Sequence, residues 1–488
     1  MSQATIAEIE TGIGERRDAR KLSVAGVLST IVFISLLGLI VLTAIPYGTS
    51  HAWWKALFVC VVFTLAILWL VEGLISDEWL KDSWPLALPL AALALFSLLQ
   101  TLALGNLGGN QRGNQSGNPA GIGFAPWNAI SADPYQTRFF ALELLALIIA
   151  GVLLFRYVST ERRLRITINV VIGVAVASAI FGILRQTTQH TPGFGLPLLL
   201  RDTGYGQFIN YNHFAYLMEM ALGLILGLVL GGGVKRDQAL IYFAALLPLW
   251  TGLVLSSSRG GLIAMLAQVI IAALLFSVVV RTRNSTGSQS KLSRLARSLA
   301  VRVGLILVLI VGVVFGTVWL GGDRLATRIE QSRDEVNPQT DTLHQGVSRN
   351  EIWTASWRLF VAHPILGVGM GAYWAAVPAV HDASGTMTPQ EAHNDYLELL
   401  ASGGLVGLAL GVWFAIVALK RMRENLGSPN RFRRAACFGA AIGIAGVTVH
   451  SLVDFGLHTM VNALAFTTLI VIATSKAPWG SERAKNYE

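Results

Sequence analysis

The hydrophobic residues of this chain come in blocks of about 20, separated by short polar stretches. A helix needs about 20 mostly apolar residues to cross the roughly 30 Å hydrocarbon layer of a membrane. The blocks predict about twelve spans, at 22–45, 53–75, 85–104, 138–155, 166–185, 213–233, 239–256, 260–280, 303–320, 402–419, 435–452 and 457–474. The predicted fold class is therefore an all-α polytopic membrane protein, with a long, partly helical loop between the ninth and tenth spans.

An even number of spans places both termini on the same side of the membrane. Most of the 37 Lys and Arg then lie on the side of the N-terminus, which the positive-inside rule assigns to the cytoplasm. The first block is too long for a signal peptide and no convincing cleavage site follows it, so we expect a retained first helix. The predicted parts are a cytoplasmic arm 1–21, spans 1–9 within 22–320 with outer loops 105–137 and 186–212, a periplasmic loop 321–401, spans 10–12 within 402–474 and a cytoplasmic tail 475–488.

Composition agrees with this pattern, since 53% of the residues are hydrophobic and only 13% are charged. A net charge of +9 could indicate a nucleic-acid partner, but the basic residues lie mainly beside hydrophobic blocks, so no nucleic-acid partner is expected. Cys60 and Cys437 lie inside two blocks, which indicates neither a disulfide framework nor a cysteine metal site. Stretch 291–302 is predicted to be an interfacial helix, and glycines spaced four apart predict close helix packing.

The string SSSRGG, Ser256 to Gly261, places Arg259 between two spans at the outer surface. A guanidinium keeps its charge and grips phosphate oxygens through paired hydrogen bonds. Small neighbours leave room for a ligand head group. An arginine that only reaches towards the membrane surface from a tight turn is the alternative interpretation.

The string HNDYLELLASGGLVG begins at His393 and leads from the longest outer loop into the tenth span. Histidine has an unperturbed pKa of about 6.5, so it can take a proton from a hydroxyl group near neutral pH. Asn394, Asp395 and Glu398 are close enough in sequence to support it. A histidine that is merely solvated is the alternative.

Two further strings carry candidate ligands. The segment from Ser348 to Tyr373 predicts an amphipathic helix on the outer leaflet, with Arg349 in its first turn, where a compensating anion or lipid phosphates would stabilise it. The string GQFINYNHFA contains Asn210 and Asn212, which suit sugar hydroxyls or simply cap the following helix, and Arg201 nearby is a second candidate phosphate ligand.

Ionisable residues inside predicted spans are costly and often mark function. Glu143 and Glu219 lie near the predicted outer surface, and His450 and Asp454 end the eleventh span on that side. An outward-facing polar cavity would gather them, whereas pairing with neighbouring helices explains each one equally well.

In combination and order, these strings resemble the O-antigen ligase and O-antigen polymerase superfamily of bacterial glycosyltransferases. The resemblance covers about 206–410: SSSRG after the seventh span, R-x-x-I-W…P-x-L-G-x-G-x-G from Arg349, and H-N-x-x-L…G-x-x-G from His393. Elsewhere only the pattern of spans agrees.

The resemblance implies a GT-C-like architecture in the bacterial inner membrane and a periplasmic active site without cofactor or metal. The implied reaction is transfer of a glycan from undecaprenyl diphosphate to a hydroxyl of lipid A–core or of a growing glycan. Membrane lipid and polysaccharide-assembly proteins are further implied partners. His393 would be the catalytic base, and Arg259, Arg349 and more weakly Arg201 would bind the diphosphate. The absence of a nucleotide-binding GxxxxGKS/T loop fits a lipid donor that carries its own leaving group.

Several functions stay open at this stage. The motifs favour a ligase only weakly over a polymerase of O-antigen or exopolysaccharide, and transfer of glycan to protein is also open. A secondary transporter of a small anion would use Arg259 and the intramembrane carboxylates, but it would be expected to have related halves and a site at the bilayer midplane. An inactive scaffold of an assembly complex is a third class.

Overall fold

The protein is described from a computed structural model, which covers residues 3–45, 47–77, 79, 83–103, 129–188, 199, 204–283, 349–381 and 389–475. In these ranges the secondary structure is helical apart from one isolated bridge between Tyr205 and Phe208. The elements are α1 (Gln3–Thr43), η1 (Tyr47–Thr49), α2 (Ala52–Ser76), α3 (Trp84–Gln100), α4 (Pro134–Tyr157), α5 (Glu161–Thr188), α6 (Tyr211–Leu230), α7 (Arg236–Leu255), α8 (Arg259–Arg283), α11 (Arg349–Ala362), α12 (Tyr373–Ala376), η4 (Val377–Ala379), α13 (Asp395–Leu426), α14 (Arg431–His450), η5 (Gly456–His458) and α15 (Met460–Thr474).

The predicted spans coincide with these helices. Among the described residues, eight helices are long and apolar enough to cross a membrane, namely α1, α2, α4, α5, α6, α7, α13 and α14. The apolar helices α3, α8 and α15 are shorter over the residues considered, and they match the third, eighth and twelfth predicted spans. The predicted ninth span 303–320, the interfacial helix 291–302 and most of loops 105–137 and 321–401 lie outside the described residues.

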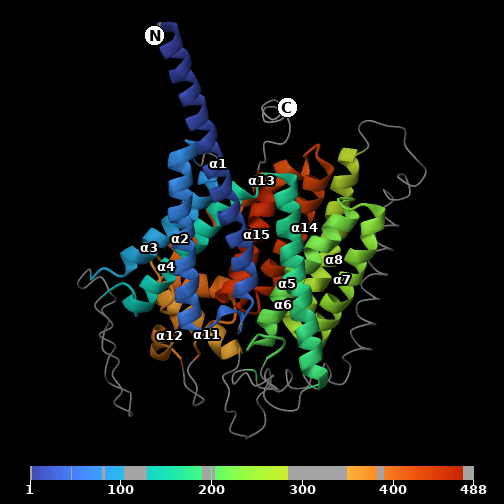
Figure 1. The fold of residues 1–488 in the computed structure, drawn as a ribbon. Helices are drawn as coiled ribbons and strands as arrows, with labels where there is room; N and C mark the ends of the chain where they lie inside the picture. The colour runs from blue at the N-terminus through green and yellow to red at the C-terminus, as the bar shows by residue number, and fades with distance from the viewer. Residues whose placement is uncertain are drawn as a thin grey trace, which may run out of the picture.

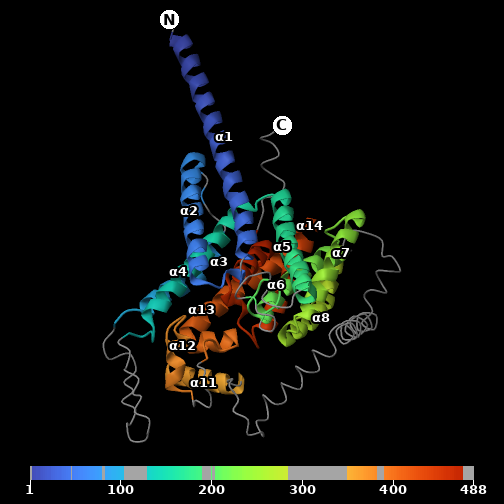
Figure 2. The same cartoon turned by 60° about the horizontal axis from the view of Figure 1, so that its bottom comes forward.

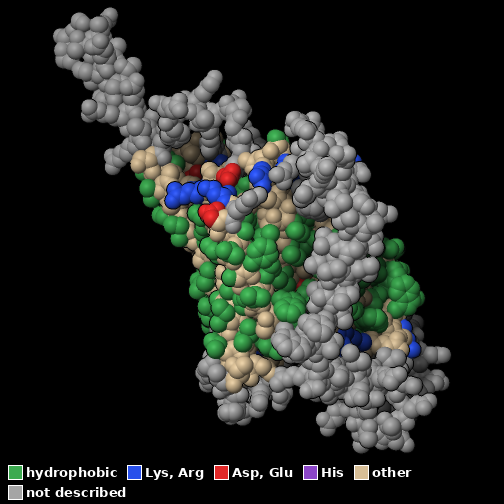
Figure 3. All heavy atoms as spheres, turned by 90° about the vertical axis from the view of Figure 1, so that its right-hand side faces the viewer, with side chains coloured by type: hydrophobic (Ala, Val, Ile, Leu, Met, Phe, Trp, Pro, Cys, Tyr) green, Lys and Arg blue, Asp and Glu red, His purple; other side chains and the backbone are tan. Residues whose placement is uncertain are grey.

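The helices stand side by side, with α11 and α12 gathered at one end of the bundle (Figure 1). The beginning of α1 lies at the opposite end, as Figure 2 also shows. We name the first of these the α11 end. Figure 3 shows a broad band of hydrophobic side chains on one flank, with charged side chains gathered along its edge. Large apolar residues such as Leu240 and Leu74, each 75% exposed, lie on the outside of the helices. Such a surface suits lipid, since a soluble protein rarely exposes so much contiguous apolar area.

Helices α6 and α14 form the centre of the bundle. Of the residues in the most apolar stretch of each helix, 83% are buried in α6 and 78% in α14. A β-carbon added to Gly227 would overlap the backbone of Gly439, and one added to Gly223 would overlap Gly443. The close packing predicted from glycines spaced four apart is therefore confirmed for α6 and α14, whereas β-carbons at Gly407 and Gly411 of α13 would meet only Leu399 of the same helix.

A bulky residue at Gly227 is expected to separate these two helices. Gly227→Leu must displace backbone atoms of α14, and overpacking of this kind typically costs about 1–3 kcal/mol. Gly38→Leu is the control, because a β-carbon at Gly38 meets no atom within 4 Å. Thermal unfolding of the purified variants in lipid nanodiscs measures the difference, and equal melting temperatures would contradict this packing.

Helix α13 begins earlier than the predicted span 402–419. Asn394 caps it at Asp395, and Gly404, with φ 60° and ψ −158°, kinks it. The two parts therefore run in different directions, and the predicted loop 321–401 ends in the first two turns of this helix. The apolar residues that define a span begin only near the kink, which explains the difference from the prediction.

A glycine-rich turn, residues 364–371, is hydrogen-bonded to α13 at this kink. Val368 and Gly369 donate backbone hydrogen bonds to Ala401 and Ser402, both at 3.0 Å. Gly367, Gly369 and Gly371 all have positive φ, which explains the glycines of the GVGMG string. The side-chain amide of Gln100 in α3 joins this contact, since it donates to Leu366 O and Ser402 O and accepts from the Met370 N–H. The beginning of α13 is thus fixed to this turn as well as to its own transmembrane part.

Candidate active site

His393 lies directly before α13, in a tightly held turn. Its φ of 50° is unusual for a residue with a side chain and is stable only where the surroundings impose it. The side chain of Asn394 accepts hydrogen bonds from the N–H groups of Tyr396 and Leu397, and Glu398 accepts one from Ala392. Asn394 and Glu398 therefore support His393 through the backbone on both sides of it.

The carboxylate beside the His393 ring belongs to Asp454. The Nδ1 atom of His393 lies 3.5 Å from Oδ1 of Asp454, whose side chain is fully buried while that of His393 is 32% exposed. The backbone N–H of Phe455 donates to the same oxygen. The Phe455 and His393 rings lie edge to face, with 4.7 Å between their centroids. Protein groups thus lie against the His393 imidazole at Nδ1 and beside its ring.

The environment keeps Asp454 ionised. Its burial opposes ionisation, but the contact with His393 and the charges of neighbouring histidines outweigh burial and lower the pKa of Asp454 to about 2. A fixed negative charge beside Nδ1 favours the tautomer that carries its proton there. In that tautomer the free electron pair of the neutral ring is on Nε2.

The SSSRGG string lies next to the beginning of α6. Ser258 donates from Oγ to Oδ1 of Asn212 at 2.7 Å, and Asn210 caps α6 by accepting from the Asn212 N–H. Arg259 follows Ser258 as the first residue of α8. Asn210 and Asn212 thus have structural partners, in agreement with the capping alternative for Asn210.

The same region connects to Asp454 through α14. A β-carbon at Gly260 would meet the ring of His450, which stacks on Tyr216 at a centroid distance of 4.1 Å. The buried His450 Nδ1 lies 2.7 Å from Glu219 Oε1, so these two intramembrane residues pair with each other. The start of α8 therefore packs against the end of α14, four residues before Asp454.

Arg349 and Arg201 are the other two predicted phosphate ligands. Arg349 begins α11, whose buried face is made of Ile352, Ala355, Ser356 and Leu359. Trp357 of the same helix lies away from this buried face, with 53% of its surface exposed. Arg201 lies outside the described residues, and nearby Arg185 donates to the Gly206 carbonyl at 2.7 Å.

A second cluster surrounds His458 in η5. Its ring nitrogens lie 3.3 Å from Glu391, 3.5 Å from Asp395 and 3.7 Å from Glu398. Asp395, predicted to support His393, thus turns its carboxylate to His458 instead. Ligand atoms of Glu391, Glu398 and His458 lie within 4.8 Å of one another, so this set has the donor types and spacing to hold a divalent cation.

The carboxylates stabilise the charged form of His458. Burial opposes protonation, but Glu398, Glu391 and Asp395 outweigh it and raise the pKa of His458 well above its usual value. Burial likewise opposes ionisation of Glu391, while His458 and other neighbours lower its pKa overall. At neutral pH the cluster therefore contains a protonated His458 beside an ionised Glu391.

The stability that this network contributes is expected to fall with rising pH. Because the folded-state pKa of His458 is raised above 6.5, the contribution is complete below that pH and disappears as the pH rises through the folded-state value. His458→Gln should therefore melt at a lower temperature than the wild type in acid, with a difference that shrinks in alkali. Melting curves in nanodiscs between pH 6 and pH 10 measure it, and a gap that widens with pH would contradict the assignment.

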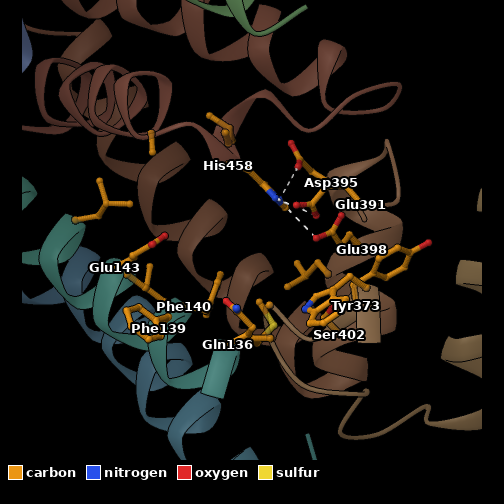
Figure 4. Close-up of a pocket in the computed structure, with 18 of the residues that line it drawn as sticks. Gln136, Phe139, Phe140, Glu143, Tyr373, Glu391, Asp395, Glu398, Ser402 and His458 are labelled. Carbon is orange, nitrogen blue, oxygen red and sulfur yellow. Dashed lines mark ion pairs between the residues drawn. The ribbon is translucent and has the colours of Figure 1, made fainter. Parts of the chain in front are cut away.

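Beside this cluster lies a cavity of about 660 Å³. Glu143, Phe139 and Gln136 of α4 lie on one side of it, and His458 with its carboxylates lies on the other (Figure 4). Glu143 also pairs with Lys55 of α2 at 3.1 Å. Glu143 and Glu219 therefore have different partners, and Glu219 is not among the residues lining this cavity.

A comparison with protein families gives a match over part of the chain. Residues 243–412, about a third of the chain, match the family model described as O-antigen ligase. Over this segment the chain is similar to the O-antigen ligase family. The matched segment contains Arg259, Arg349 and His393, the three residues on which the sequence resemblance mainly rests. No curated protein matches the chain.

The match agrees with the sequence resemblance over the segment that carries its motifs. Asp454 and His458 lie beyond the matched segment, in the connection between α14 and α15. Sequence reasoning noted Asp454 only as the end of a span and missed His458. A signal was present: the short string HSLVDFGLH, from His450 to His458, carries three ionisable residues at a span boundary.

Proposed function

We propose that this protein transfers a glycan from undecaprenyl diphosphate to an acceptor hydroxyl, with His393 as the general base. The observation that carries the proposal is the pairing of a part-exposed His393 with a buried, ionised Asp454. A histidine held in one tautomer by a carboxylate is the arrangement that activates a hydroxyl.

In the proposed reaction, Nε2 of His393 removes the proton of the acceptor hydroxyl as its oxygen attacks the anomeric carbon. The new carbon–oxygen bond forms on the face opposite the leaving group, so the configuration inverts. The bond to the diphosphate breaks and its electron pair leaves with the phosphate oxygen. Arg259 and Arg349 neutralise the charge that grows there, and Arg201 is a further candidate.

The position of Arg259 supports this role. It begins α8, and its neighbours Ser258 and Gly260 lie against Asn212 of α6 and His450 of α14. Helix N-termini favour anions. A lipid diphosphate fits because a positive site at the edge of the membrane belt can receive a head group whose chain remains in lipid. We place the site on the periplasmic face of the bacterial inner membrane, with both termini cytoplasmic.

Among acceptors we favour lipid A–core, as in a ligase, with polymerisation of lipid-linked repeats as the alternative within the superfamily. Product length distinguishes them. The purified protein in proteoliposomes is incubated with lipid-linked oligosaccharide, with and without the core acceptor. A ligase gives product only with the acceptor, whereas a polymerase gives a ladder of longer glycans from the donor alone. No glycan transfer in either reaction would contradict the proposed function.

The transporter alternative has less support. It requires intramembrane carboxylates around a common path, yet Glu219 pairs with buried His450 and Glu143 pairs with Lys55. Each of these carboxylates thus has a basic partner close by. Pairing with a neighbouring helix is the alternative that the sequence had left open for Glu143 and Glu219.

A further inference from the structure

The cavity beside His458 has no role in the proposed reaction so far. It lies between α4, the α12 segment, the beginning of α13 and η5. Aromatic side chains form part of its wall and hydrogen-bonding groups form the rest. The aromatic residues are Phe139, Phe140, Tyr373 and Trp374, and the polar ones are Lys55, Gln136, Glu143, Gln390, Glu391, Asp395, Glu398, Ser402 and His458.

This cavity adjoins the His393 site through a shared phenylalanine. The Phe455 ring contacts the His393 ring at 4.7 Å and the His458 ring at 5.6 Å. The cavity is thus one ring away from the proposed base, but it is lined by other residues. A molecule in it would lie next to the reaction without occupying the position of the diphosphate.

The lining predicts a particular ligand chemistry. Carboxylates and amides accept and donate the hydrogen bonds that hydroxyl groups require, and flat aromatic faces pack against the apolar faces of sugar rings. The two basic side chains of the lining, Lys55 and His458, face four carboxyl groups, so the cavity offers no excess of positive charge to a phosphate. The cavity therefore suits a neutral, hydroxyl-rich group. Its volume is within the usual range of about 300–1,000 Å³ for small-molecule sites.

An apolar groove continues from this cavity. It has a volume of about 240 Å³ and is lined almost wholly by hydrophobic side chains of α3, α4, α13 and α15. Leu144, Leu147, Leu457 and Ala463 line both spaces. The two together have the shape and polarity of an amphiphile, with room for a sugar in the polar part and for hydrocarbon in the apolar part.

We infer that the cavity and groove bind a glycolipid, with a neutral sugar beside His458 and its hydrocarbon chain in the groove. The assignment of this glycolipid as the acceptor, whose hydroxyl reaches His393 past Phe455, rests on the proposed function. The binding itself does not. Donor diphosphate and acceptor sugar would then approach the base from different sides.

The test uses a photoreactive, diazirine-bearing dodecyl maltoside and the full-length protein in nanodiscs. Peptides from α4, the α12 segment and η5 are expected to carry the label. Excess dodecyl maltoside should remove the label, whereas dodecyl phosphate at the same concentration should not. Trp374→Ala and Phe139→Ala remove aromatic contacts from two different helices, and each should lower labelling about tenfold. Trp357→Ala is the matched control, since this exposed tryptophan of α11 does not line the cavity.

Three results would overturn the inference: label only at other helices, equal competition by dodecyl phosphate, or the same loss in Trp357→Ala as in both cavity variants. Melting temperatures of all variants identify any that fail to fold. Labelling as expected without glycan transfer by the wild type would refute the proposed reaction and leave the binding site standing. Glycan transfer without labelling of these helices would refute the binding site and leave the proposed reaction standing.

Discussion

His393→Ala is expected to lower the initial rate of glycan transfer by about a hundred- to ten-thousand-fold, the usual contribution of a positioned general base. The alanine cannot accept the acceptor's proton, so the attacking oxygen would have to carry a positive charge in the transition state. Folding should be retained, because the His393 side chain is 32% exposed and the turn is also held by Asn394 and Glu398. The measurement is the rate of product formation from lipid-linked oligosaccharide in proteoliposomes.

His51→Ala serves as the control for this experiment. His51 is the N-cap residue of α2, makes no side-chain capping bond, and its ring contacts Tyr47. Wild-type rates are expected for it. Transfer by His393→Ala at a rate close to that of His51→Ala would remove His393 from the mechanism.

The second large effect is expected at Asp454. Asp454→Asn keeps the shape of the side chain but removes the charge that fixes the His393 tautomer, and the amide can donate to Nδ1 and so place the proton on Nε2. We expect a loss of about a hundredfold or more in transfer rate, since the equivalent change in a serine-protease triad costs about ten-thousand-fold. Affinity for the lipid-linked donor should change little, because Asp454 is buried.

The pH profile separates this role from a purely structural one. The pKa of Asp454 is held at about 2, so its stabilising charge is present above its ordinary value of 3.8 and is lost only as the pH falls towards 2. A decline in wild-type rate between pH 7 and pH 5 would therefore report a group other than Asp454. If Asp454→Asn transferred glycan at the wild-type rate throughout this range, Asp454 would have no positioning role.

Much of the fold follows from periodicity alone. In the described part of the chain all eleven predicted spans lie on helices, because a hydrocarbon environment permits few other structures and the apolar blocks mark them directly. The start of α13 was less predictable. Its first two turns carry polar residues and precede a kink at Gly404 that depends on contacts with residues 364–369, which are distant in sequence.

The site was predictable in part. His393 and Arg259 were found because each stands in a distinctive string at a membrane boundary. The partner of His393 was not found, because neighbours in sequence were the only candidates at hand, whereas the fold brings Asp454 to it across 60 positions. Asp395 illustrates the reverse: adjacent helix positions point in different directions, so this close neighbour contacts His458.

The kink at Gly404 has a mechanical consequence. Residues 364–369 are hydrogen-bonded to α13 on both sides of the kink, to Ala401 and Ser402 before it and, through backbone carbonyls, to Leu405 and Val406 after it. A change in bilayer thickness acts on the transmembrane part of the helix and tilts it. Because both sides of the kink are bonded to the same turn, we expect the kink region to move as one unit and the bending to fall in the later turns of α13. The geometry around the His393 imidazole would then be insulated from the thickness of the lipid.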